Sequence, residues 1–320
     1  MRAPAPAAGP DPAPDPEVRR WIRRELAGAP PQAPSLIITV WGDAIAPHGG
    51  AAMLPGIIDL LAPLGINERL VRTSVFRLAR EGWLKATPVG RRSLYRLTRD
   101  GARRFEQAYR RIYAPPVLGW DETWELVVAN GIKARTRRAL KLELQWEGFG
   151  TIASGVYARP ATAPSAVPRI AAALAIAREL VVVRARDDAV LGGRTLASAG
   201  PRAWDLAGLA AGYRRFLRRF GSVIERFRMA GGAGHDPAQA FIVRTLLIHA
   251  YRRVLLRDPQ LPATLLPLDW PGAAAYALCR DFYRLTHRAA ERHLLATLED
   301  ARGGLPPASA EFHARFGGLG

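Results

Sequence analysis

Cysteine is almost absent from this chain, and its scarcity limits the chemistry available. Cys279 is the only cysteine among 320 residues, so neither an intramolecular disulfide nor a cysteine-based zinc site can form. A single thiol suits a reducing compartment, and we expect a cytoplasmic protein in which Cys279 is a small buried side chain. The six histidines show neither HxxxH nor HExxH spacing, so we expect no metal site and no cofactor.

Long apolar runs are also missing. Arg169 and Arg178 interrupt the longest ones, which stay well short of the roughly 18 residues that a transmembrane helix needs. Arginine pairs near residue 20 resemble an export signal, but Glu25 and three prolines follow them in place of an apolar run. With 49% hydrophobic and 23% charged residues, the composition indicates a folded, non-secreted protein of two or three domains.

Acidic residues are outnumbered, and the excess of basic charge predicts an acidic partner. The chain has 46 Lys and Arg against 28 Asp and Glu, a net charge of +18. Nucleic acid, an anionic membrane surface or a polyphosphate ligand would each complement this positive charge. A membrane-surface role would need a basic amphipathic helix outside any folded core, and none stands apart, so we expect no membrane partner.

Composition and proline clusters divide the chain into five segments. Residues 1–34, rich in Ala and Pro, are predicted to be a disordered arm and lead-in. Three domains follow, at residues 35–114, 115–190 and 191–305, before a tail at 306–320. The first and third of these domains carry most of the excess positive charge.

The first domain has the order helix, helix, helix, hairpin. Apolar spacing predicts helices over residues 36–44, 54–61 and 68–82, the last with Asn67 as its N-cap. Period-two alternation then predicts strands at 83–87 and 93–97, joined by a tip with one glycine and two arginines. This order is typical of a winged helix-turn-helix, whose third helix enters a DNA groove. A helix over residues 99–113 closes the domain.

The rest of the chain reads as a small α+β domain followed by helices. Strands are predicted at residues 124–129, 151–159 and 179–186, with helices at 133–146 and 167–177 between them. This alternation suggests a ferredoxin-like fold. The last third predicts three long helices, at residues 206–229, 237–256 and 272–300, and the fold class is therefore α+β with an all-helical C-terminal domain.

Four blocks of sequence, in order, resemble the PaaX family of repressors of phenylacetic acid catabolism. They are WGDAIAPHGG at 41–50, LGINERLVRTSVFRLAREGWL at 64–84, GRRSLYRLT at 90–98 and DPQLPATLLPLDWPG at 258–272. The resemblance implies a winged-helix domain, a middle domain similar to Cas2 and a helical C-terminal domain. It also implies a homodimer on double-stranded operator DNA, released by an acyl-CoA effector, phenylacetyl-CoA, and no enzymatic activity.

The residues predicted to contact DNA lie on one helix face and at the wing tip. Arginine binds phosphate or the edge of guanine, and Thr and Phe can meet a thymine methyl. The helix contributes Arg69, Arg72, Thr73, Phe76, Arg77 and Arg80, and the wing contributes Arg91 and Arg92. The alternatives are a solvated basic face, a solvated hairpin tip and, for Phe76, packing beneath the wing.

Two regions are predicted to hold the effector. The helix after the first middle-domain strand opens with basic residues, and Arg135 and Arg138 are candidates for the phosphates, although a solvated face is the alternative. The proline-rich loop 258–272 is the second region, with Trp270 facing the apolar end of the ligand or, alternatively, sealing the core. His249, Arg252 and Tyr276 flank this loop in sequence and complete the predicted effector set.

A Cas2-like domain raises an alternative function, a metal-dependent nuclease. Such an enzyme needs carboxylates that converge on a metal ion. The strand at 124–129 is followed by Asn130, where the nuclease resemblance would require Asp. Because Asn cannot replace a charged ligand, the sequence disfavours this alternative.

Overall fold

The computed structural model describes residues 11–115, 119–187, 195–231 and 234–319, which form two compact units. The larger unit comprises residues 1–114, 216–252 and 275–320, and the smaller comprises 115–215 and 253–274. One long helix, α9 (Leu206–Ala230), contains the boundary between them. No helix among the described residues is long and apolar enough to cross a membrane.

The larger unit begins with a helix that the sequence analysis did not predict. Within the lead-in that follows the predicted arm, α1 (Pro16–Gly28) is capped by the side chain of Asp15, which accepts a hydrogen bond from the Glu17 amide. Its Val18, Trp21 and Ile22 are buried. The sequence analysis missed this helix because proline-rich flanks concealed its amphipathic pattern; residues 1–10 of the predicted arm lie outside the described part.

Three helices and a small sheet follow. The helices are α2 (Ala33–Val40), α3 (Leu54–Leu61) and α4 (Glu68–Arg80), and a π-helical turn, η1 (Trp41–Ile45), continues α2. The remaining short turns before α4 are η2 (Ala46–His48) and η3 (Ala62–Leu64). This is the helical order predicted for the first domain.

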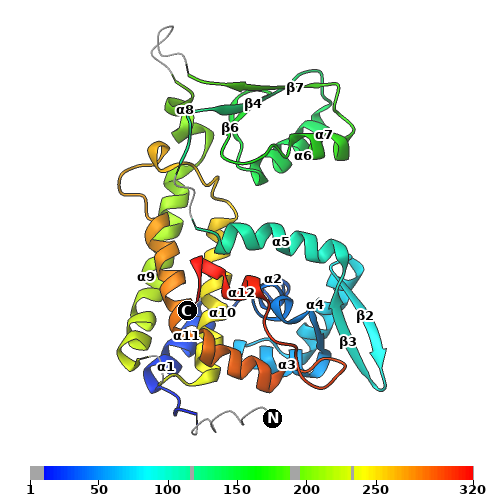
Figure 1. Ribbon diagram of the computed structural model, residues 1–320, viewed down its shortest axis with the longest axis vertical. Coiled ribbons are helices and arrows are strands. Elements are labelled where there is room, and N and C mark those ends of the chain that lie inside the picture. Colours follow the sequence, from blue (N-terminus) through cyan, green and yellow to red (C-terminus); the bar gives the residue numbers. More distant parts are fainter. Residues whose placement is uncertain (1–10, 116–118, 188–194, 232–233, 320) are drawn as a thin grey trace, which may run out of the picture. The chain divides into compact units, whose positions relative to one another are not determined.

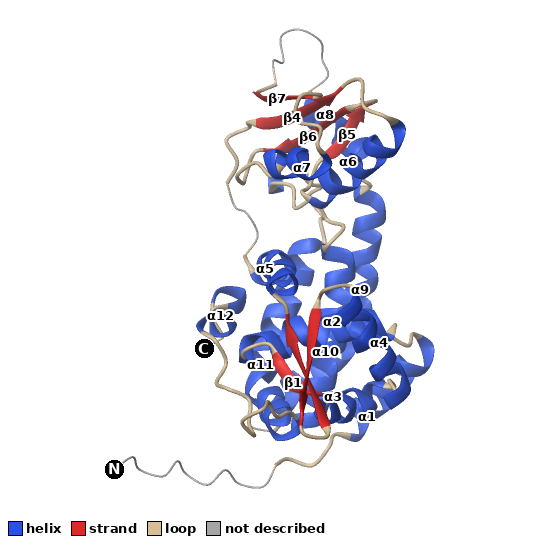
Figure 2. Ribbon diagram, turned by 90° about the vertical axis from the view of Figure 1, so that its right-hand side faces the viewer, coloured by secondary structure: helices blue, strands red, loops and turns tan. Residues whose placement is uncertain are grey.

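The predicted hairpin is present and has a third strand. The strands β2 (Leu84–Val89) and β3 (Arg92–Leu97) pair antiparallel, and β1 (Ala51–Met53) pairs with the other edge of β3. At three residues, β1 is too short to show alternation, so the sequence did not reveal it. Figures 1 and 2 show the hairpin beside α4, and α5 (Arg99–Tyr113) follows it as predicted.

Helices from the C-terminal third complete this same unit. They are the second part of α9, most of α10 (Pro237–Leu255) and α11 (Gly272–Thr297). The C-terminal segment adds α12 (Ala310–His313) and η5 (Arg315–Gly317), with Phe312 and Phe316 buried. The contacts thus group the predicted first domain with the C-terminal helices and the predicted tail, whereas the sequence analysis had separated them at residues 114, 191 and 305.

The smaller unit contains the predicted ferredoxin-like domain. Its four strands lie in the antiparallel order β5-β6-β4-β7, and α6 and α7 cover one face, as Figure 2 shows. The expected strand at 151–159 is in fact a hairpin that turns at Gly155 (φ +72°). The bounds are β4 (Trp124–Ala129), α6 (Ala134–Trp146), β5 (Gly150–Ala153), β6 (Val156–Pro160), α7 (Val167–Leu174) and β7 (Leu180–Ala185).

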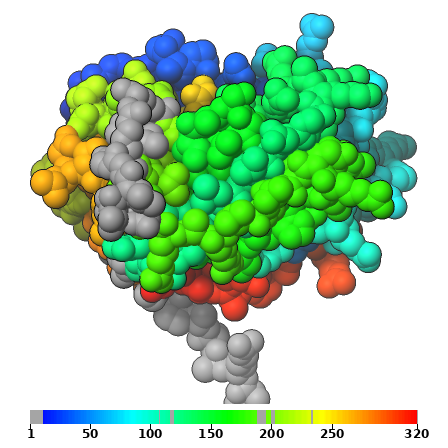
Figure 3. All heavy atoms as spheres, turned by 90° about the horizontal axis from the view of Figure 1, so that it is seen from above, coloured from blue at the N-terminus to red at the C-terminus, as the bar shows by residue number. Residues whose placement is uncertain are grey.

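Two packed clusters hold the smaller unit together. Val127 and Leu140 belong to the core between the sheet and its two helices. On the other side, Trp124 stacks on Trp204 at 6.3 Å between ring centroids, near α8 (Leu196–Ala203) and the short turn η4 (Ala263–Leu265). Figure 3 looks onto this unit, whose atoms from residue 119 to residue 187 are green.

Candidate nucleic-acid interface

The helix α4 is fixed at its start and along its inner side. The Asn67 Oδ1 atom accepts a hydrogen bond from the Leu70 amide at 2.9 Å, which caps the helix as predicted. Val71, Val75 and Leu78 are buried against the rest of the unit. This packing leaves the opposite side of α4 facing solvent, and all six side chains predicted to contact DNA from this helix are exposed.

The four arginines of this exposed face fall into two classes. The Arg72 Nε atom donates to Glu68 Oε1 at 2.8 Å, and Arg77 Nε lies 3.6 Å from Glu81 Oε1, so both guanidinium groups have an acidic neighbour one turn away. Among the described residues, Arg69 and Arg80 have no such partner. These two guanidinium groups are therefore free to bind an external anion or the edge of a base.

Thr73 and Phe76 lie between the two unpaired arginines along the helix. The Thr73 hydroxyl donates to the Arg69 carbonyl oxygen at 2.8 Å, so its polar group is already bonded within α4. Phe76 is 60% exposed. The alternative in which Phe76 packs beneath the wing is thus wrong, and the ring is presented to solvent.

The two arginines of the wing tip have different surroundings. The turn consists of Gly90 and Arg91, and Gly90 adopts φ +59°, a value that favours glycine. Arg91 is exposed and has no acidic partner within the described part of the chain. Arg92, by contrast, donates to Glu299 Oε1 at 2.8 Å, beyond the end of α11. Arg91 is therefore available to a ligand, whereas Arg92 ties the wing to the C-terminal helices.

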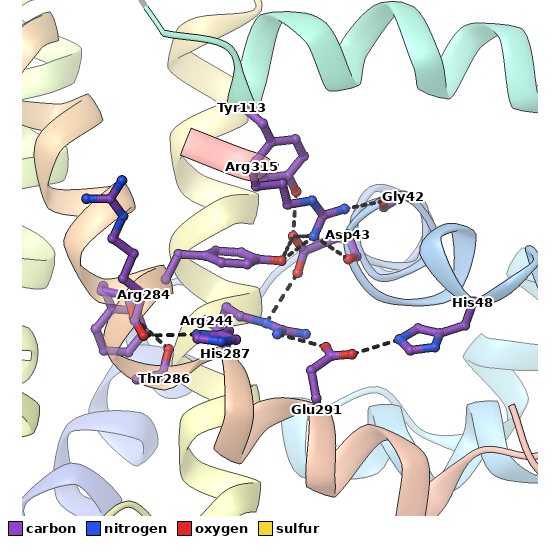
Figure 4. A network of polar contacts seen from close by, with 12 residues as sticks. Gly42, Asp43, His48, Tyr113, Arg244, Arg284, Thr286, His287, Glu291 and Arg315 are labelled. Carbon is purple, nitrogen blue, oxygen red and sulfur yellow. Dashed lines mark hydrogen bonds and ion pairs between the residues drawn. The ribbon is translucent and has the colours of Figure 1, made fainter. Parts of the chain in front are cut away.

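A buried network of charged groups joins the turns after α2 and the helix α5 to the C-terminal helices (Figure 4). Its centre is Asp43 in η1, which is 2% exposed. The Arg315 Nη1 atom donates to the Asp43 carbonyl oxygen at 2.8 Å, and Arg244 Nε of α10 lies 3.5 Å from Asp43 Oδ2. Tyr113 of α5 and Tyr283 of α11 both donate to Asp43 Oδ1. Five separate elements thus meet at one carboxylate.

The network continues to a second carboxylate. Arg244 Nη1 donates to Glu291 Oε1 at 3.0 Å, and His48 Nε2 lies 2.7 Å from Glu291 Oε2. His48 Nδ1 also lies 2.6 Å from the Pro306 carbonyl oxygen. Burial opposes ionisation of Glu291, but the hydrogen bond from His48 and the charge of Arg244 outweigh it and hold the pKa of this carboxyl below its ordinary value.

The tyrosines of the network act as hydrogen-bond donors. Burial is the largest influence on both phenols and raises the pKa of Tyr113 and of Tyr283, although Arg315 lowers each in part. Both hydroxyls therefore stay protonated at neutral pH. Sequence reasoning missed this network; its one available signal was Asp43, a charged residue inside an otherwise apolar helical segment.

The residues predicted to bind the effector do not all belong to one unit. Arg135 and Arg138 on α6 are exposed, and Trp270 lies in the tryptophan-rich cluster of the same unit, 5.9 Å from Tyr213 between ring centroids. His249, Arg252 and Tyr276 belong to the larger unit.

The three residues in the larger unit have structural partners. His249 Nδ1 lies 2.9 Å from the Thr39 hydroxyl, and Arg252 Nη1 donates to the same oxygen at 2.7 Å, which joins α10 to α2. The Tyr276 ring packs edge-on against Phe316 at 5.4 Å between centroids. These contacts assign packing roles to the three side chains, and their predicted contact with an effector remains a prediction.

The structure gives no support to the nuclease alternative. Asn130 is exposed just after β4. Among the described residues, no group of three or more His, Cys, Asp or Glu side chains could hold a metal ion.

Three protein-family models together match about three quarters of the chain. The PaaX-like protein family model matches residues 32–101, the PaaX protein central Cas2-like domain matches 118–197, and the PaaX-like protein C-terminal domain matches 204–296. The chain belongs to the PaaX family. The resemblance stated from four sequence blocks is thereby confirmed, as is the Cas2-like middle domain.

Two individual proteins are similar over most of their length. The transcriptional repressor PaaX of Escherichia coli (strain K12) is 33% identical over 299 residues, covering 93% of this chain and 94% of the relative. The solved structure of the uncharacterized protein Rv0674 from Mycobacterium tuberculosis is 27% identical, with a TM-score of 0.55, and covers 82% of this chain and 98% of that protein. The similarity to the repressor thus includes all three predicted domains.

Proposed function

We propose that this protein is a transcriptional repressor that binds double-stranded operator DNA through α4 and the wing, and that it is not an enzyme. The observation that carries the proposal is the exposed side of α4, where the guanidinium groups of Arg69 and Arg80 have no acidic partner among the described residues and flank Thr73 and Phe76. A repressor that is similar over nearly the full length supports the same role. Arg91 at the wing tip adds a third guanidinium group that has no acidic partner in the described part of the chain.

The proposal includes a homodimer, because paired recognition helices read a two-fold operator. Two α4 helices would occupy half-sites whose centres lie about one helical turn, 34 to 36 Å, or a multiple of it apart. Selection of genomic fragments by the purified protein, followed by footprinting, tests this. We expect protection of an inverted repeat and a dimeric mass in sedimentation. Protection of one asymmetric half-site by a monomer would contradict the dimer, and absence of sequence-specific binding would contradict the repressor role.

We further propose that phenylacetyl-CoA releases the operator. Arg135 and Arg138, exposed and without acidic partners among the described residues, would bind phosphates of the CoA moiety, and Trp270 of the same unit would contact its apolar end. A ligand releases DNA only if it binds the DNA-free state more tightly, so operator DNA must weaken thioester binding by the same factor.

A mobility-shift titration tests the effector proposal. We expect phenylacetyl-CoA to release the operator and free phenylacetate at the same concentration not to, because the free acid lacks the phosphates. R135A/R138A should need a higher thioester concentration for release, whereas R178A, which removes an exposed arginine of the same unit, should respond like the parent. Equal release by the free acid would overturn the proposal, and an unchanged response of R135A/R138A would overturn the phosphate assignment.

A further inference from the structure

The centre of the exposed α4 face is apolar, although the face as a whole is basic. Arg69, Thr73, Phe76 and Arg80 follow one another at intervals of four, three and four residues, so they form one row along the helix. At 1.5 Å per residue the row is about 16 Å long, which corresponds to about five base-pair steps of DNA. The two unpaired arginines stand at its ends, and the apolar groups lie between them.

The hydrogen bond of Thr73 limits what its side chain can offer to a ligand. Its hydroxyl is committed to the Arg69 carbonyl oxygen within the helix at 2.8 Å. The hydroxyl therefore has no proton to donate to a base, and the γ-methyl is the apolar group that Thr73 offers to a ligand. Beside it, Phe76 exposes 60% of its surface where solvation alone gives an aromatic ring no benefit.

We infer that Thr73 and Phe76 form a receptor for the 5-methyl group of thymine and so determine part of the operator sequence. Thymine is the base that offers an apolar group in the major groove. The inference rests on the proposed function and adds the substrate feature that this face reads. It predicts a thymine near the middle of each half-site, between the positions engaged by Arg69 and Arg80.

The alternative is that the exposed Phe76 contacts a protein partner. Two features favour DNA. The apolar groups are few, and the side chains one turn away on either side of Phe76, Arg72 and Arg80, are basic. The core of a protein interface is depleted of charge and uses a larger apolar area.

Replacing thymine by uracil removes only the methyl group and gives a direct test. With operator fragments selected by the parent protein, we expect uracil at one central position of the half-site to weaken binding about fourfold, the effect of one buried methyl group. Replacing thymines outside the centre of the half-site by uracil should leave the affinity unchanged.

Matched variants of Thr73 separate the methyl group from the hydroxyl. T73S keeps the hydroxyl and loses the methyl, whereas T73V keeps a methyl and loses the hydroxyl. We expect T73S and F76A to bind thymine and uracil operators equally, and T73V to retain the preference for thymine. Both residues are exposed, so circular dichroism should show all three variants folded like the parent.

The failures of the inference and of the proposed function are distinguishable. If the parent binds a specific operator but discriminates against uracil at no position, the thymine receptor is overturned and the repressor role stands. If the parent binds no DNA specifically, both are overturned. If F76A leaves discrimination intact and instead lowers the mass of the assembly in sedimentation, Phe76 is a protein contact, which also overturns the inference.

Discussion

At the scale of single residues, Asp43 is a buried carboxylate that lies between two buried arginines of the larger unit. It lies with Arg244 and Arg315, and all three side chains are no more than 2% exposed. Buried ion pairs give little net stabilisation when complete, because desolvation offsets their attraction, but removal of one partner leaves an uncompensated charge. This asymmetry makes Asp43 a sensitive position.

We predict that D43N lowers the free energy of unfolding by about 3 to 5 kcal/mol. The amide cannot balance two buried guanidinium groups. Urea titration measures the change, and D100N is the matched control, because Asp100 pairs with Arg103 at the surface and its loss should cost about 1 kcal/mol or less. Equal stability of D43N and the parent would contradict the assigned role.

Glu291 predicts how stability depends on pH. Its pKa in the folded protein lies below the ordinary value of 4.5. The unfolded state thus binds its proton first, so the stabilisation is complete above about pH 4.5 and is lost as the pH falls through the folded pKa. We expect E291Q to be less stable than the parent at pH 7. As the pH falls below about 4.5, the variant should lose less stability than the parent does. An identical acid dependence of the two proteins would refute this.

At the scale of secondary-structure elements, the wing is positioned by the start of α5. Gly101 lies in the first turn of that helix, and a Cβ atom there would stand 2.3 Å from the carbonyl oxygen of Trp83, just before β2. The Thr98 amide also donates to this carbonyl at 3.1 Å. Any side chain at Gly101 therefore displaces backbone rather than a flexible group.

We predict that G101A destabilises the protein by about 1 to 3 kcal/mol and weakens operator binding, because the wing with Arg91 shifts. Thermal unfolding and fluorescence anisotropy with labelled DNA measure the two effects. G28A, at the end of α1, has open space around its new methyl group and should change neither. A G101A variant that matches the parent in both assays would show that this close approach does not position the wing.

The elements that sequence patterns predicted well are those whose stability is local or strongly periodic. The helix α4 was foreseen because its cap and its buried stripe lie within 15 residues, and α5 and β4 were predicted with their observed bounds. The amphipathic pattern of α1 was concealed by its proline-rich flanks, and the short strand β1 depends on pairing with the distant strand β3, which local patterns do not reveal. For the same reason, the engagement of Arg92 by Glu299 was invisible in the sequence.

At the scale of the whole molecule, the predicted DNA-binding domain lies in the same compact unit as most of the C-terminal helices. Its helices share a core and a buried ion network with α10, α11 and the C-terminal segment. Sequence composition could not show this, because the participating residues are separated by up to 272 positions. The C-terminal helices are therefore in direct contact with the elements that precede α4, and a structural change in them would act on those elements.

The proposed DNA-binding surface is the exposed face of α4, where Arg69 and Arg80 are the arginines without an acidic partner among the described residues. The most direct test is the operator affinity of R69A/R80A, measured by fluorescence anisotropy across a range of salt concentrations. R103A/R110A is the control, since it removes the same charge from two exposed arginines of α5 that already pair with acidic residues. All three proteins should show the same helical content.

We predict that R69A/R80A binds at least about tenfold more weakly than the parent, because each arginine loses a phosphate or a base contact. The slope of log affinity against log salt concentration should become shallower by about one for each phosphate contact removed. The R103A/R110A control should retain nearly the parent affinity. If R69A/R80A instead matches the parent in both affinity and salt slope, α4 is not the recognition helix.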